Sequence, residues 1–306
     1  MVKRQEVLSV SEAFAMFKAV KATRGAKTVF NYEQSFSFFV KDNGIGEDTL
    51  IKSVTFKTIC GWIEDMKERG LKVSSINHYL GDIRVFLYWC MSEGYMSSYK
   101  ISLVKGQKPA PKFYTDEEIE VLIKKPKKSE LFSQYRAWVV ICFILATGAR
   151  ASTLVNIKIS DIDFVQKEIL YRHLKNKSVA IIPLSKSLEK VLRDYLHDWK
   201  REKEDGWLFC DSSERQCTVS ALHQSMENYC NRRGIKSRGL HALRHSFARG
   251  YILNGGSAFK LQKILTHSTI EMTKRYVTLF SDDLKTNYEQ FSPLDSFSGG
   301  GKVSRK

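Results

Sequence analysis

The stretch LHALRHSFAR, residues 240–249, places two histidines and two arginines among ten mostly apolar positions. His241 and Arg244 lie three residues apart, so in a helix they project from one face. His241 and His245 lie four apart, which is also the spacing of two zinc ligands in a helical metalloprotease. That motif has Glu after its first His, whereas this sequence has Ala242. The role of these hydrogen-bond donors must therefore be inferred together with the polar residues elsewhere in the chain.

The chain is strongly basic. Its 306 residues include 49 Lys and Arg against 33 Asp and Glu, which gives a formal net charge of +16. Such a surplus attracts polyanions, and nucleic acid is the commonest of them. The length exceeds the usual limit of a single hydrophobic core, so we expect two domains.

No segment of the sequence predicts a secreted or membrane protein. The N-terminus lacks an apolar segment after its basic residues, and no window approaches the ~18 apolar residues of a membrane span. We therefore expect a cytoplasmic location and no membrane contact. The six cysteines are scattered without a C-x-x-C pair, which favours reduced core residues over disulfides or metal ligands. They are Cys60, Cys90, Cys142, Cys210, Cys217 and Cys230.

Residues 1–105 predict a bundle of about four helices, because apolar positions recur every three or four residues. We expect these helices near 11–22, 27–41, 56–66 and 74–93. In the last, Ser74 or Ser75 is a candidate N-cap and Gly94 a candidate end. Its apolar stripe consists of Ile76, Leu80, Ile83, Leu87 and Cys90.

A polar, basic linker at 106–113 precedes a second domain at 114–297, and a Gly-rich basic tail covers 298–306. The Thr-x-x-Glu pattern at Thr115 predicts the capping box that opens the domain. An apolar helix then runs to Gly148, and two β-rich runs around Lys175 predict a hairpin. Further helices are expected at 187–200, 219–233, 241–253, 257–265 and 269–280. The fold class is therefore mainly α, with a small β-hairpin or sheet.

Polar residues interrupt this second domain at four places. They are Arg150, Lys175, the pair His241 and Arg244, and finally His267 with Tyr276. Arginine, lysine and histidine together supply many donors and no acidic metal ligand, which suits a phosphate that gains charge in the transition state. A tyrosine phenol is a tolerable leaving group, so a phosphotyrosine link can form and reverse.

Four segments resemble the tyrosine recombinases, the family of phage integrases and Xer proteins. GLHALRHSFAR is similar to the family's His-x-x-Arg box, and ILTHSTIEMTKRYVTL to its second His followed by the nucleophilic Tyr. ATGARASTLVNIKISDID is similar to the box of the first Arg, and LKNKSVAIIPL to the hairpin with the catalytic Lys. The resemblance spans roughly residues 115–280, and a helical, SAM-like core-binding domain fits residues 1–105.

The resemblance implies a role for each matching residue. Arg150, Arg244 and His267 would bind the non-bridging oxygens of the scissile phosphate. Lys175 would protonate the leaving 5′ hydroxyl, with Lys177 as its rival in the hairpin. His241 would act as general base or donor near the nucleophile. Tyr276 would attack to leave a 3′-phosphotyrosyl DNA, and no cofactor or metal is implied.

Within the same boxes, other residues receive lesser roles or depart from the family. His245 is interpreted as a buried hydrogen-bonding residue and Arg249 as a surface cation. Thr153 stands where the family usually has Glu three residues after the first Arg, so Arg150 lacks an acidic partner there. Thr266 replaces the Gly before the second His. Neither departure is expected to abolish activity.

The resemblance implies double-stranded DNA with recombination core sites as the partner, and a homotetramer on DNA. Accessory DNA-bending or directionality proteins are further candidate partners. Asn77 and His78, opposite the apolar stripe of 74–93, are candidate groove readers. The spaced apolar residues at 281–297 would dock on a neighbour or fold back on their own domain: Leu284, Tyr288, Phe291 and Leu294.

The lack of an extra N-terminal domain favours a simple recombinase, which serves the integration and excision of a mobile element or the resolution of a replicon. Three alternatives stay open. They are a type IB topoisomerase, a catalytically idle DNA-binding protein of the same fold, and a zinc protein that uses His241 and His245.

Overall fold

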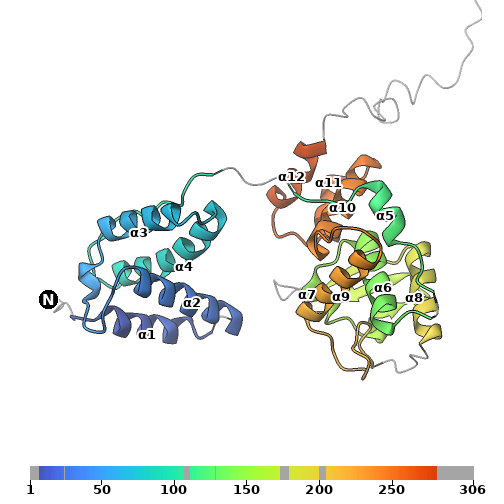
Figure 1. Ribbon diagram of the computed structural model, residues 1–306, viewed down its shortest axis with the longest axis horizontal. Helices are drawn as coiled ribbons and strands as arrows, with labels where there is room; N and C mark the ends of the chain where they lie inside the picture. Colours follow the sequence, from blue (N-terminus) through green and yellow to red (C-terminus); the bar gives the residue numbers. More distant parts are fainter. Residues whose placement is uncertain are drawn as a thin grey trace, which may run out of the picture. The chain divides into compact units, whose positions relative to one another are not determined.

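The structure is a computed structural model that describes residues 7–23, 25–106, 111–127, 129–172, 179–199 and 205–280. The chain forms two compact units, Met1–Pro109 and Ala110–Lys306 (Figure 1). The described residues are mostly helical with one small sheet, which confirms the predicted fold class. Part of the predicted linker, the hairpin tip and the segment after 280 lie outside the described residues.

The first unit is a bundle of four helices, as predicted. They are α1 (Val10–Lys21), α2 (Ala26–Asp42), α3 (Phe56–Glu68) and α4 (Val73–Ser92). All five residues of the α4 stripe are buried. The predicted cap of α4 is wrong: the N-cap is Lys72. The helix begins at Val73, so Ser74 and Ser75 lie inside its first turn.

The prediction that Asn77 reads a DNA groove is not supported by its contacts. Its side-chain amide donates to the carbonyl of Val104 at 2.9 Å, and its side-chain oxygen accepts from the Val104 N–H at 2.8 Å. Both polar groups of Asn77 therefore fasten the segment after α4 to the bundle. His78 beside it is exposed, so it stays a candidate.

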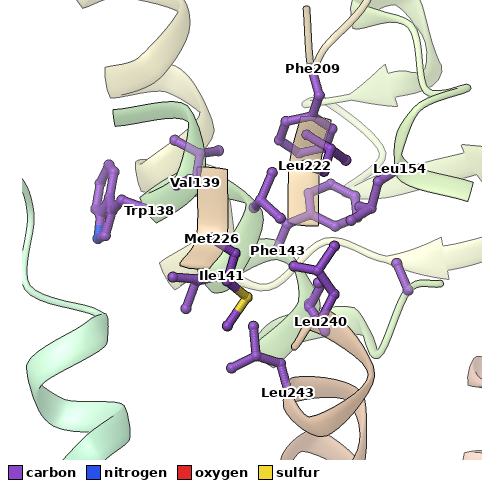
Figure 2. Close-up of a cluster of buried hydrophobic side chains, with 14 of the residues drawn as sticks. Trp138, Val139, Ile141, Phe143, Leu154, Phe209, Leu222, Met226, Leu240 and Leu243 are labelled. Atoms are coloured by element: carbon purple, nitrogen blue, oxygen red, sulfur yellow. The ribbon is translucent and has the colours of Figure 1, made fainter. Parts of the chain in front are cut away.

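The second unit is built around one buried helix. Its helices are α5 (Asp116–Leu122), α6 (Phe132–Thr147), α7 (Ala151–Leu154), α8 (Lys186–Asp198), α9 (Val219–Arg232), α10 (Leu240–Leu253), α11 (Ala258–Ile264) and α12 (Glu271–Phe280). Helix α6 packs against α8, α9 and α10. Figure 2 shows Phe143 of α6 among apolar side chains from α9 and α10, including Met226 and Leu243. This apolar contact fixes α10, which carries two of the six predicted site residues, His241 and Arg244.

A three-stranded antiparallel sheet accompanies these helices. Its order is β1 (Ile162–Asp163), β2 (Glu168–Tyr171) and β3 (Ala180–Pro183). Strands β2 and β3 are the predicted hairpin, with Ile169 opposite Ile182. Strand β1 was not predicted, because two residues are too short to display an alternating pattern. Lys175 and Lys177 fall in 173–178, outside the described residues.

Local signals set the ends of several elements. Thr115 and Glu118 form the predicted capping box, with Thr115 accepting from the Glu118 N–H. Gly148 ends α6 with a left-handed φ of 65°. None of the six cysteines forms a disulfide, and four of them are buried. Among the described helices, none is long and apolar enough to cross a membrane.

Candidate active site

Three segments of the second unit carry the described site residues. Arg150 is the N-cap of α7, directly after the end of α6. His241 and Arg244 lie on α10. His267 follows α11, and Tyr276 lies on α12. Helix α10 packs against both α11 and α12, so residues far apart in the sequence meet in one place.

Arg244 is buried, with 2% of its surface exposed. Its NH1 group donates to the carbonyl of Gly148 at 2.6 Å, and NH2 donates to the carbonyl of Leu265 at 2.8 Å. NH2 also lies 2.9 Å from Nε2 of His267. Burial, and then repulsion by Arg150, lower the pKa of Arg244 to about 10.

Arg150 is half-buried, and its hydrogen bonds to described residues all go to Thr266. Its NH1 group donates to Oγ1 of Thr266 at 2.6 Å, and both terminal nitrogens lie 3.4 Å from the Thr266 carbonyl oxygen. Burial lowers the pKa of Arg150 too. In the described part of the chain, neither Arg150 nor Arg244 has a carboxylate among the groups that shift its pKa. Two neighbouring positive charges therefore lie together with no carboxylate from the described residues acting on either of them.

His267 connects the arginine pair to α12. Arginine can only donate, so Nε2 of His267 accepts from Arg244 and the ring proton lies on Nδ1. Nδ1 then donates to Oγ1 of Thr273, 2.9 Å away. Burial, followed by repulsion from Arg244 and Arg150, lowers the pKa of His267 to about 4. The imidazole is therefore neutral at pH 7.

Tyr276 is 4% exposed, and its hydroxyl lies 2.7 Å from Nδ1 of His245. Its ring stacks against that of His267 at 6.4 Å between centroids. The ionised Tyr276 oxygen would raise the pKa of both Arg150 and Arg244, so it lies within electrostatic reach of the arginine pair.

Two interpretations of the α10 box need correction. His245 is only half-buried and contacts the expected nucleophile directly, whereas His241 is exposed, with its ring 4.5 Å from that of His245. Arg249 is not a simple surface cation: it is half-buried, with NH1 3.5 Å from Asp116. Sequence spacing placed both histidines on one face of α10 but did not show which of them faces α12.

The two departures from the family pattern also have definite positions. Thr153 is buried, one turn after Arg150. Thr266 supplies the hydroxyl that binds Arg150, a contact that the sequence reasoning missed. The sequence did show a threonine where the family usually has glycine, but it did not show that Arg150 is the partner of this threonine. As for zinc, the described residues contain no group of three or more His, Cys, Asp or Glu that could hold a metal ion.

This arrangement is suited to binding a phosphodiester beside a nucleophile. Two guanidinium groups that the described residues leave without a carboxylate would be stabilised by a phosphate between them. A tyrosine hydroxyl that is hydrogen-bonded to an imidazole lies on the adjoining helix. Charge stabilisation and positioning are the main requirements of phosphoryl transfer.

Comparison with known proteins agrees with this chemistry. The profile of the phage integrase family matches residues 112–282. The chain belongs to this family. Its members, the Xer proteins and integrases, are tyrosine recombinases that act as site-specific DNA recombinases. Over 292 residues, this recombinase is 26% identical to the tyrosine recombinase XerD of Listeria monocytogenes, covering 92% of this chain and 98% of XerD.

Solved integrase structures share the fold of this recombinase. The Tn1549 transposon integrase in complex with a circular intermediate DNA superposes with a TM-score of 0.73 at 18% identity, covering 88% of this chain and 95% of that one. A lambda integrase dimer bound to a COC′ core site superposes with a TM-score of 0.72 at 17% identity. The match covers 99% of this chain and 82% of the integrase chain.

Proposed function

We propose that this recombinase cleaves and rejoins double-stranded DNA through a 3′-phosphotyrosine on Tyr276. The observation that carries the proposal is the pair Arg150 and Arg244, held side by side without a carboxylate among the described residues and within electrostatic reach of Tyr276. Such a pocket is costly to the fold unless an anion occupies it. The net charge of +16 supports DNA as the source of that anion.

The reaction exchanges one phosphoester for another. The Tyr276 oxygen attacks the phosphorus, and the bond from phosphorus to the 5′ oxygen of the next nucleotide breaks. The phenol proton passes to Nδ1 of His245, the group that already binds it. Lys175 gives a proton to the leaving 5′ oxygen, the role that the resemblance implies. Rejoining reverses each transfer.

The remaining residues bind and orient the phosphate. Arg150 and Arg244 bind its non-bridging oxygens and oppose the charge that grows in the transition state. His267 keeps Arg244 in place through Nε2 and reaches the phosphate only after that contact opens. His241 is exposed one turn from His245, so a donor role towards the phosphate suits it better than that of the base.

The biological role that we propose is integration and excision of a mobile element, or resolution of a replicon. Similarity to XerD supports the second, and the fold shared with a transposon integrase supports the first. Both roles need two DNA sites brought together, so we propose a homotetramer on DNA, with accessory DNA-bending or directionality proteins as further partners.

The test is covalent trapping on DNA that the protein itself selects. Duplexes retained from a random pool are rebuilt with a nick that lets the fragment beyond the cleavage point escape, and are incubated with wild type and with Tyr276→Phe. We expect a denaturant-resistant adduct on the 3′ phosphate with wild type only. Wild type that binds the selected DNA without forming an adduct is an idle DNA-binding protein. A topoisomerase would relax a supercoiled plasmid that lacks the selected site as fast as one that carries it.

A further inference from the structure

Helix α11 ends in a tight, hydrogen-bonded turn. The N–H of Thr266 donates to the carbonyl of Lys263, and the N–H of His267 donates to that of Gln262, both at 3.0 Å. These two bonds define the Schellman motif, whose turn residue has a left-handed backbone. Thr266 accordingly has a φ of 51°. Glycine is usual at this position because it has no Cβ to clash.

The same turn recurs in this chain, always with glycine elsewhere. Helices α2, α3, α4, α9 and α10 end with the same pair of backbone bonds. Their left-handed residues are Gly44, Gly70, Gly94, Gly234 and Gly255. Among the described helices that end this way, α11 alone has a residue with a side chain. A β-branched residue is strained in this conformation, and such strain persists where the side chain has a function.

The side chain of Thr266 has one described polar partner. Its Oγ1 accepts a 2.6 Å hydrogen bond from NH1 of Arg150, which is shorter than the 3.4 Å contacts of that guanidinium with the Thr266 carbonyl. A hydroxyl fixes the direction of the guanidinium but carries no charge. Arg150 is thereby oriented without being neutralised, and its full charge stays available to a phosphate.

The neighbouring residues of this turn serve the second arginine. The carbonyl of Leu265 and Nε2 of His267 both contact Arg244. Three consecutive residues at the end of α11 therefore hold both arginines. Thr153, the neutral residue one turn after Arg150, is buried and brings no charge to the pocket.

We propose that Thr266 is a positioning residue, which directs Arg150 to the scissile phosphate in the place of an acidic partner. The inference rests on the proposed function and adds to it the reason for a strained, non-glycine turn. Two requirements therefore conflict at position 266. The backbone conformation favours glycine, whereas the hydrogen bond to Arg150 requires a side-chain hydroxyl.

Three substitutions separate the effect of the hydroxyl from the effect of the backbone strain. Thr266→Val keeps the branched shape and the strain but removes the acceptor. Thr266→Ser keeps the acceptor. Thr266→Gly removes both acceptor and strain. Thr269→Val is the matched control, since Thr269 is exposed in the same loop.

On the selected nicked duplex, we expect single-turnover cleavage by Thr266→Val to slow about 10- to 100-fold, the worth of a hydrogen bond to a charged group. Thr266→Ser restores most of the rate, and Thr269→Val cleaves as wild type does. Thr266→Gly cleaves slowly yet melts about 2–4 °C higher than wild type. A gain in stability with a loss of rate is not expected of a merely structural residue.

A second readout does not need cleavage. Inorganic sulfate should raise the melting temperature of wild type above that in chloride of equal ionic strength, because it binds the folded arginine pair. Thr266→Val should need several times more sulfate for the same rise. If wild type forms no adduct, the proposed function fails, and this sulfate response still decides the role of Thr266. If Thr266→Val cleaves as fast as wild type and responds to sulfate as wild type does, the inference is wrong.

Discussion

The hydroxyl of Tyr276 lies 2.7 Å from Nδ1 of His245, although 31 residues separate the two in the chain. With the ring proton on Nε2, Nδ1 accepts from the phenol and is already placed to take its proton. The hydrogen-bond partner of the proposed nucleophile is therefore His245, whereas the sequence analysis favoured His241.

His245→Asn tests whether this imidazole is a base or only an anchor. The amide can hydrogen-bond the phenol, but it cannot carry away a proton, so we expect covalent adduct formation to slow by about 10²-fold or more while DNA binding is kept. Quenched-flow trapping measures the rate, with His241→Asn as the matched comparison. A larger loss in His241→Asn would return the role of base to His241.

The stability of the protein should fall as the pH is lowered from about 6.5 towards 4. The pKa of His267 is about 4 in the folded chain and near 6.5 when unfolded, so between these values only the unfolded state binds the proton. Urea unfolding at pH 7, 5.5 and 4.5 measures the effect. His267→Gln keeps an acceptor for Arg244 and does not titrate, so its stability should depend less steeply on pH. Parallel curves for the two proteins would contradict the assignment.

Arg150→Met should make the empty protein at least as stable as wild type. The substitution removes the charge that repels Arg244 and keeps most of the side-chain volume. Adduct formation should fall about 10²- to 10³-fold, the usual loss for one transition-state donor. Thermal unfolding in chloride buffer and trapping on the selected duplex give both values. A clear loss of stability would mean that Arg150 serves the fold.

Gly148→Ala should be strongly destabilising. Gly148 has a φ of 65°, and an added Cβ would lie 2.5 Å from Phe247 and 2.6 Å from Leu265. We expect a loss of about 2–3 kcal/mol in unfolding free energy, and slower cleavage because the Gly148 carbonyl binds Arg244. Gly61→Ala is the control: its Cβ would meet nothing within 4 Å, and the helix should gain about 0.5–1 kcal/mol.

Asn77→Ala should change stability and not sequence preference. It removes both hydrogen bonds to Val104, at a cost of about 1–2 kcal/mol. Repeating the selection from the random duplex pool should return the wild-type site. His78→Ala, at the exposed neighbouring position, is the contrasting variant. If Asn77→Ala selects a different DNA sequence, Asn77 reads a DNA groove as the sequence analysis predicted.

Periodicity and caps predicted most of the helices, because those signals are local. The stripe of α4 and the capping box at Thr115 needed only neighbouring residues. Strand β1 and the single turn of α7 were missed, since neither is long enough to show a period. The candidate site residues were proposed from the resemblance, which did not indicate that His245 is the hydrogen-bond partner of Tyr276. Which face of α10 meets α12 is decided by packing between distant segments.

The hydrogen bond from His267 to Thr273 joins the turn that holds both arginines to α12, the helix of the proposed nucleophile. Thr273 is fully buried one turn before Tyr276, and the same histidine also contacts Arg244. One imidazole therefore couples the proposed nucleophile to the proposed phosphate-binding arginines. Displacement of α12 would break the Thr273 contact of that imidazole and withdraw the Tyr276 hydroxyl from His245 in the same movement.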